Sequence, residues 1–78
     1  CAVCHGPEGR GDGPAARDLI PPPADLTVHA LHHTDGELFW WISRGVRGTA
    51  MPAFEGRLSE QERWHVVNFL RSLAPRAP

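Results

Sequence analysis

The most informative stretch of the sequence is the N-terminal pentapeptide Cys1-Ala2-Val3-Cys4-His5, which contains both cysteines of the chain. Two cysteines at this spacing suit a disulfide, a thioredoxin-like redox pair, half of a zinc site or a haem attachment site. A redox pair belongs beside a strand of a βαβ unit, and no strand pattern adjoins the pentapeptide. A zinc site needs two further ligands, for which His29, His32 and His33 could be nominated. The histidine directly after the second cysteine favours haem attachment.

Haem attachment explains why these residue types stand at this spacing. Each thiol can add across one vinyl group of haem and leave a thioether bond, and the adjoining His5 then offers an imidazole nitrogen to the iron. Covalent attachment also lets a short chain keep its haem without a deep pocket. The pentapeptide therefore predicts one covalently bound haem with His5 as its proximal ligand.

The length of 78 residues allows one domain, residues 1–78, with a small core. Glycine and proline number eight each, a loop-forming composition that argues against a full core made of side chains alone, so a cofactor is expected at the centre. The net charge of −1 gives no reason to expect nucleic acid or an anionic membrane as partner. All eight basic residues are arginines, and no run approaches the roughly 20 apolar residues that span a bilayer.

The chain has helix signals but no alternating pattern typical of strands, so the predicted fold class is all-α. Thr34 with Glu37, and Ser59 with Glu62, form capping boxes where two helices should begin, and Gly45 should end the first. The expected order is a loop over 1–14, short helical turns over 15–20, an extended segment over 21–23, a helix over 34–44, a loop over 45–56 and a helix from 59 to before Pro75. The long loops are expected to wrap a cofactor.

Three stretches of the chain resemble class I c-type cytochromes, particularly small bacterial monohaem domains found alone or fused to larger redox proteins. They are CAVCHGPEGRGDGPAARDLIPPPADLT (1–27), HTDGELFWWISRGVRGTAMPAF (33–54) and LSEQERWHVVNFLRSL (58–73). The resemblance implies a cytochrome c fold around one haem c, attached through Cys1 and Cys4. It also implies that Met51 supplies its thioether sulfur to the iron opposite His5.

Met51 is the only methionine of the chain, and its surroundings agree with this role. It stands in a loop between small residues and Pro52, where packing alone gives little reason for a long flexible side chain. A Met/His ligand pair raises the reduction potential of the haem. The resemblance further implies that a proline carbonyl accepts a hydrogen bond from His5. We expect Pro14 in that role, with the Pro21–Pro23 run as the fallback.

Weaker candidates stand near the expected ligand loop. Of Trp40 and Trp41, one is expected against the haem edge, and we take it to be Trp41. Arg44 or Arg47 could pair with haem propionates, with Arg47 as our choice and a solvated surface position as the alternative for each. The remaining histidines are expected on the surface: His29, His32, His33 and His65.

With His5 and Met51 both on the iron, no substrate can bind it. The expected function is therefore transfer of single electrons between redox proteins, not catalysis, and no small-molecule substrate is expected. No paired carboxylates, nucleophile–base pair or phosphate-binding loop points to an enzyme. Two alternatives stay open. One is a haem domain with a labile sixth ligand, acting as a gas sensor or peroxidase; the other is a structural metal module built from Cys1, Cys4 and histidines.

The resemblance also implies an N-terminal helix that leads into the haem motif and crosses the last helix. Nothing precedes Cys1, whereas the last helix carries a broad apolar face that includes Trp64, Val67, Phe69 and Leu70. We therefore expect the chain to be a fragment of a longer protein, with membrane contact only through a missing anchor or fused domain. Haem attachment to this motif in bacteria implies a location in the periplasm or on the outer face of the cytoplasmic membrane.

Overall fold

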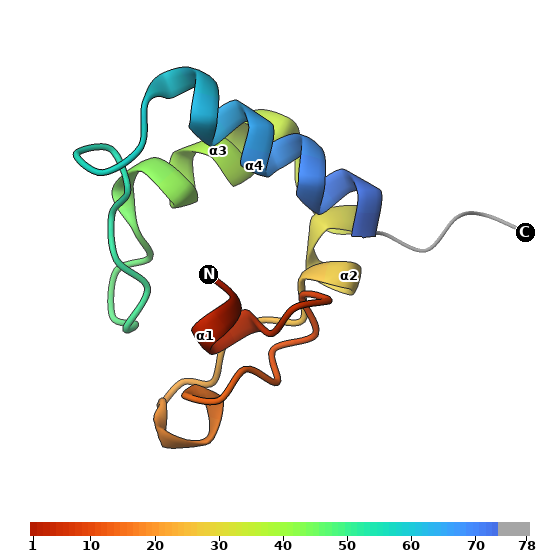
Figure 1. The fold of residues 1–78 in the computed structure, drawn as a ribbon, viewed down its shortest axis with the longest axis vertical. Coiled ribbons are helices and arrows are strands. Elements are labelled where there is room, and N and C mark those ends of the chain that lie inside the picture. The colour runs from red at the N-terminus through yellow and green to blue at the C-terminus, as the bar shows by residue number, and fades with distance from the viewer. Residues whose placement is uncertain (74–78) are drawn as a thin grey trace, which may run out of the picture.

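The computed structural model of the chain describes residues 1–73, and these residues form helices and loops without any strand. The elements are α1 (Ala2–His5), η1 (Ala16–Asp18), α2 (Leu26–His29), η2 (Ala30–His32), α3 (Asp35–Arg44) and α4 (Glu60–Leu73). In Figure 1 the chain follows an incomplete ring, with α3 and α4 side by side on one side and α1 on the other. The predicted all-α class is confirmed, and Pro75 lies outside the described residues.

The two longer helices begin where their capping boxes predict. Thr34 Oγ1 accepts the Glu37 N–H at 3.1 Å, and the Glu37 carboxylate accepts the Thr34 N–H at 2.9 Å. Ser59 Oγ and the Glu62 carboxylate make the same reciprocal bonds, at 3.1 and 2.8 Å. Gly45 ends α3 with φ 74°, a left-handed conformation that favours glycine. Local hydrogen bonds therefore fix three helix boundaries independently of tertiary packing.

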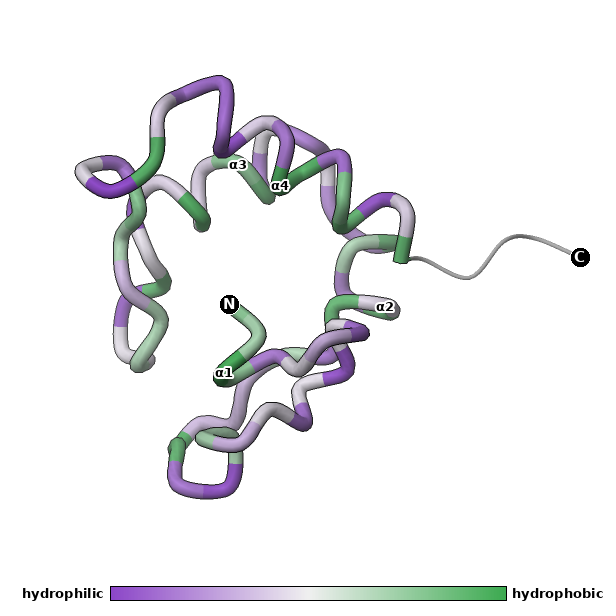
Figure 2. The backbone as a smooth tube through the Cα atoms, viewed as in Figure 1, coloured by the Kyte–Doolittle hydropathy of each residue, from purple (hydrophilic) through white to green (hydrophobic). Residues whose placement is uncertain are grey.

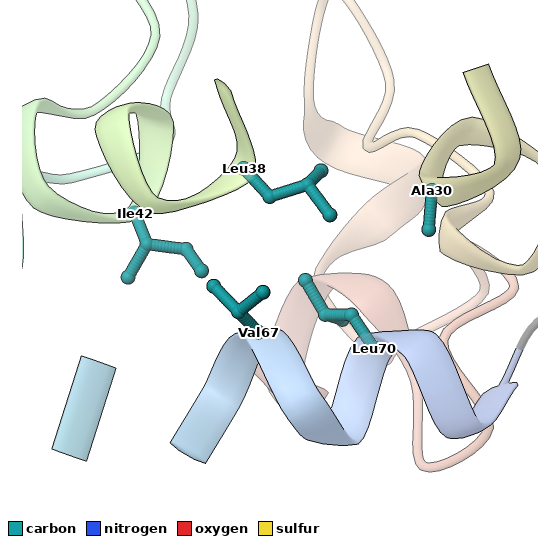
Figure 3. Packing of buried hydrophobic residues seen from close by; sticks show 5 residues of the cluster. All are labelled: Ala30, Leu38, Ile42, Val67 and Leu70. Carbon is teal, nitrogen blue, oxygen red and sulfur yellow. The ribbon is translucent and has the colours of Figure 1, made fainter. Parts of the chain in front are cut away.

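The side-chain core is small and joins only α3, α4 and η2. Its five buried hydrophobic residues are Ala30, Leu38, Ile42, Val67 and Leu70. Figure 3 shows Leu38 and Ile42 of α3 pointing toward Val67 and Leu70 of α4, with Ala30 beside Leu70. Fully burying one such aliphatic side chain contributes about 1.5–3 kcal/mol, so this cluster is the main apolar stabilisation of the described residues.

The N-terminal third of the chain contributes no hydrophobic side chain to this core. The buried residues among the first 25 are all glycines: Gly6, Gly9 and Gly13. Figure 2 shows this part of the backbone mostly hydrophilic or neutral between α1 and α2. Such a segment cannot be held by apolar burial among its own side chains, which agrees with the expectation that a cofactor occupies the centre of the fold.

The apolar face expected on the last helix is divided between two environments. Val67 and Leu70 are buried against α3 and η2. Trp64 stacks on Phe39 with ring centroids 4.0 Å apart and an interplanar angle of 14°, and stays 37% exposed. Phe69 is 55% exposed. The helix therefore uses α3 as partner for most of this face, with Phe69 facing outward.

Candidate haem site

Within the pentapeptide 1–5, residues Ala2–His5 form the single helical turn α1, and Cys1 directly precedes this turn. The His5 N–H donates to the Cys1 carbonyl at 2.8 Å, which closes the turn. Residues three and four apart share one face of a helix, so Cys1, Cys4 and His5 lie on the same side of this turn. Both cysteines are free thiols, with Cys1 exposed and Cys4 half-buried. The turn thus presents two thiols and an imidazole together.

The glycine-rich loop that follows binds the carbonyl groups that so short a helix leaves without partners. Four backbone N–H groups donate to successive carbonyls of α1 at 2.8–2.9 Å: Gly6 to Ala2, Ala15 to Val3, Gly13 to Cys4 and Gly11 to His5. The contact is close, because a Cβ on Gly13 would lie 2.3 Å from the Val3 carbonyl oxygen. The loop therefore needs glycine at this position and holds the cysteine turn rigid.

The imidazole of His5 is oriented by a backbone carbonyl far along the chain. Its Nδ1 lies 3.0 Å from the carbonyl oxygen of Ala24. With the ring proton on Nδ1, this nitrogen donates to Ala24 and Nε2 keeps its lone pair for a metal ion. A half-buried imidazole held in this tautomer is the arrangement that a proximal haem ligand requires.

The expectation that Pro14 supplies this carbonyl is wrong. The residues on either side of Pro14 both donate to carbonyls of α1, namely Gly13 to Cys4 and Ala15 to Val3, so Pro14 is tied to the cysteine turn and is itself exposed. The acceptor is instead the residue directly after the Pro21–Pro23 run, which was the fallback segment. The extended proline run carries the chain back past His5 before α2 begins.

Gly11 permits this close return of the chain. Its φ is +83°, in the left-handed region, and a Cβ there would lie 2.7 Å from the Pro23 carbonyl oxygen and 3.2 Å from that of Ala24. The Gly11 N–H also donates to the His5 carbonyl. Gly11 therefore stands between His5 and the segment that carries its acceptor, where only a residue without a side chain fits.

Met51 stands in a loop that its own hydrogen bonds shape. The Thr49 hydroxyl donates to the Val46 carbonyl at 2.7 Å and accepts the Met51 N–H at 3.2 Å. A Cβ on Gly45 would lie 2.8 Å from the Met51 carbonyl oxygen, so the loop folds back tightly onto the end of α3. Met51 is half-buried and packs against the core cluster.

A surface groove beside Met51 collects the other predicted site residues. It is lined by Trp40, Trp41, Arg44, Arg47, Met51 and the intervening loop from Gly45 to Thr49. Trp41 is half-buried, whereas Trp40 is 56% exposed. In Figure 1 this loop runs along the left edge of the view, and α1 lies nearer the middle. The structure thus brings Trp41, Arg47 and Met51 together in one groove, which the cysteine turn does not line.

The two arginines of the groove differ in their contacts. The Arg44 guanidinium stacks over the Trp40 ring at 4.7 Å, and its Nε lies 3.2 Å from a carboxylate oxygen of Glu55. Arg47 makes no ion pair with any residue that the structure describes. Arg47 is therefore the more available of the two for an anionic group, and its pairing with a propionate stays a prediction.

A cluster of aromatic rings between α2 and α3 was not predicted from the sequence. The rings of His29 and His33 lie 4.4 Å apart, and His33 contacts the Trp41 ring edge-on at 4.7 Å. His33 Nδ1 also lies 3.6 Å from a Glu37 carboxylate oxygen. Both histidines are half-buried, so the expectation that they are surface residues is wrong, whereas it is confirmed for His32 and His65. The spacing of four residues from His29 to His33 to Glu37 was the available signal.

Burial lowers the pKa of His29 from its ordinary value of 6.5, and the positive charges of His33, His32 and His5 lower it further. Among residues 1–73, no group of three or more His, Cys, Asp or Glu side chains could hold a metal ion, so the nominated histidines do not join the cysteines. Nor does any helix of this range have the length and apolarity to cross a membrane.

The turn thus presents two thiols and an oriented imidazole, the residue types to which haem attaches covalently. The family model for cytochrome c matches residues 1–74, and the chain belongs to the cytochrome c family. Its structure is similar to a chain of the reducing HAO-like protein complex of Kuenenia stuttgartiensis, with a TM-score of 0.83 and 33% sequence identity. The match covers 96% of this chain but only 38% of that one. No curated protein is significantly similar in sequence.

Membership of this family confirms the predicted cytochrome c fold and the predicted cofactor, a covalently attached haem c. The residues fit that group. Cys1 and Cys4 are free thiols on one face of a turn, and the His5 ring has one nitrogen occupied by Ala24 and the other available.

Proposed function

We propose that this domain passes single electrons between redox proteins, with His5 and Met51 as the two axial ligands of haem c and without catalytic activity of its own. The observation that carries the proposal is the hydrogen bond from His5 Nδ1 to the Ala24 carbonyl at 3.0 Å, which leaves Nε2 as the ligand atom. When bound, haem c supplies a one-electron couple. The protein contributes attachment, orientation and burial.

The His5 side of the site works as one rigid unit. The thiols of Cys1 and Cys4 form the attachment, and His5 follows on the same turn, so a shift of one moves all three. The hydrogen bond to Ala24 fixes the ring plane and makes the imidazole a stronger donor. Rigid ligands suit electron transfer, because the protein then reorganises little when the charge of the iron changes.

The Met51 side supports the proposal through loop geometry and side-chain chemistry. A thioether is a soft donor that favours ferrous iron and so raises the potential. The hydrogen bonds of Thr49 restrict the loop, and Trp41 lines the same groove as Met51. A half-buried aromatic ring in the same groove limits the access of water to the groove. These features favour a firmly held sulfur ligand over the labile ligand of a gas sensor or peroxidase.

The partners belong to the proposal as well. We propose redox proteins as donor and acceptor, supported by the similar chain that stands in a protein complex. We also propose a location in the periplasm or on the outer face of the cytoplasmic membrane, because haem attachment to this motif in bacteria takes place outside that membrane. Donor and acceptor are then expected in the same compartment.

Absorption spectra of the oxidised and reduced protein test the ligand set. We expect low-spin haem in both states and a sulfur-to-iron charge-transfer band in the ferric protein. Haem should stay with the chain after denaturation, because the thioether bonds are covalent. High-spin ferrous haem in the unmodified protein would favour the labile-ligand alternative, and a colourless protein without iron would contradict haem binding altogether.

A further inference from the structure

Arg71, in the last turn of α4, makes three hydrogen bonds to a segment 36–41 residues earlier in the chain. Its Nε lies 2.7 Å from a carboxylate oxygen of Asp35, and its Nη2 lies 2.5 Å from the carbonyl oxygen of His33. Its Nη1 donates to the carbonyl of Ala30. One guanidinium thus joins α4 to both ends of η2 and to the first turn of α3.

The chemistry of arginine suits this position. A planar guanidinium presents donors in a fixed fork, so it can bind a carboxylate and two carbonyls at once, which a lysine ammonium cannot reproduce in the same geometry. Ala30 is fully buried, so water has little access to replace the bond to its carbonyl. The end of η2 therefore depends on Arg71 for its polar partners.

The segment that Arg71 holds begins directly after Ala24, whose carbonyl oxygen is the acceptor for His5. The Asp25 side chain caps α2 by accepting the Thr27 N–H at 3.0 Å, and the His29 N–H donates to the Asp25 carbonyl at 2.9 Å. The α2–η2 segment, residues 25–33, is thus a short continuous helical unit directly after Ala24. Its start is tied to the N-terminal loop by the Leu26 N–H, and its end is tied to α4 by Arg71.

We propose that Arg71 is a positioning residue for the proximal ligand: by fixing the α2–η2 segment, it keeps the Ala24 carbonyl on His5 Nδ1 and so sets the donor strength of the His5 imidazole. Arg71 itself touches neither His5 nor the haem site. The proposal rests on the proposed function, in which His5 ligates the iron.

Loss of the three bonds has a defined consequence. The α2–η2 segment gains freedom, the hydrogen bond from His5 Nδ1 weakens, and the imidazole becomes a poorer donor that stabilises ferric iron less. The reduction potential therefore rises. Removing the positive charge of Arg71 would instead lower the reduction potential, because a cation disfavours ferric iron. Arg71→Lys keeps the charge and removes the fork, so it isolates the geometric effect.

The experiment compares the haem-loaded chain with its Arg71→Lys and Val66→Ala variants. Val66 is also on α4 and packs against the core, so its truncation lowers stability without altering the guanidinium. Three quantities are measured: unfolding free energy in denaturant, reduction potential, and hydrogen exchange of the His5 Nδ1–H by NMR in the ferrous protein. The potential and the exchange rate report on His5, whereas unfolding reports on stability alone.

We expect Arg71→Lys to raise the potential and to speed exchange of the His5 Nδ1–H on the order of tenfold, the loss equivalent to one charge-assisted hydrogen bond. Val66→Ala should leave the reduction potential unchanged. Once each exchange rate is corrected for the loss of unfolding free energy, Val66→Ala should also speed exchange of the His5 Nδ1–H less than Arg71→Lys does. Equal behaviour of the two variants would overturn the positioning role and leave Arg71 as a structural residue. Failure of His5 ligation would already appear in the unmodified protein, as an absent low-spin spectrum, and would overturn both proposals.

Discussion

Ala24 and His5 are 19 residues apart in the sequence, yet the carbonyl oxygen of Ala24 lies 3.0 Å from Nδ1 of His5. The approach depends on Gly11, whose missing side chain leaves space for Pro23 and Ala24. The residue that orients the His5 imidazole therefore belongs to neither the cysteine turn nor its loop. It is supplied by the segment that leads into α2, and mutations in that region should change the properties of His5.

Gly11→Ala tests this approach. The new Cβ would meet the Pro23 carbonyl oxygen at 2.7 Å, so the segment has to move away from His5. Gly48→Ala is the matched control, because Gly48 has a similar φ of +81° but open space where its Cβ would lie. Both variants carry the left-handed strain of about 1–2 kcal/mol in unfolding free energy.

In denaturant unfolding of the haem-loaded protein, only Gly11→Ala should lose more unfolding free energy than this strain accounts for. It should also raise the reduction potential, because the hydrogen bond to Ala24 is weakened. Equal losses of unfolding free energy in the two variants would mean that Gly11 serves backbone conformation alone.

Thr49→Val tests the loop that carries Met51. Valine keeps the shape of threonine but loses the hydroxyl that bonds to Val46 and Met51, which should cost about 1 kcal/mol of unfolding free energy. The looser loop should let carbon monoxide displace the sulfur more readily in the ferrous protein. Thr49→Ser, which retains the hydroxyl, should restore the parent rate. Identical carbon monoxide kinetics in all three proteins would show that the hydroxyl does not restrain Met51.

The lowered pKa of His29 predicts that stability depends on pH. Because the folded-state pKa lies below the ordinary value of 6.5, the unfolded chain takes up a proton at His29 before the folded chain does. The contribution to stability is therefore complete above pH 6.5 and is lost as the pH falls through 6.5 toward the lowered folded-state pKa.

Denaturant unfolding between about pH 8 and about pH 5 measures this dependence. His29→Gln should flatten the decline of unfolding free energy on the acid side. His65→Gln is the control, since His65 is exposed on α4. A decline that is as steep in His29→Gln as in the parent would assign the effect to other groups.

Local signals in the sequence predicted the long helices and identified the haem motif, because each depends on residues close together in the chain. The expectation of a loop over 1–14 is wrong for Ala2–His5, which form the single turn α1. The capping boxes at Thr34 and Ser59 satisfy the first N–H groups of α3 and α4 within four residues. The short turns expected over 15–20 correspond to η1. The α2–η2 segment was not predicted, since single turns this short are marginal without tertiary contacts.

Long-range contacts could not be predicted in the same way. The acceptor for His5 was expected at Pro14, because the family resemblance implies a proline carbonyl. No local pattern indicated that the chain returns to His5 at Ala24. Arg71 stands on an amphipathic helix, where no local pattern distinguishes it from a solvated side chain. The contact between His33 and Trp41 likewise arises from the turn between η2 and α3. These contacts depend on how the helices pack, which the pattern of one sequence leaves open.

Carbon monoxide binding to the ferrous protein, compared between the parent and Met51→Ala, tests the central claim most directly. The variant should keep its haem through Cys1 and Cys4 but expose the sixth iron position, because no other methionine exists in the chain. We expect carbon monoxide to bind rapidly to Met51→Ala and slowly or not at all to the parent. A variant that binds carbon monoxide no faster than the parent would contradict Met51 as the ligand of an electron-transfer haem.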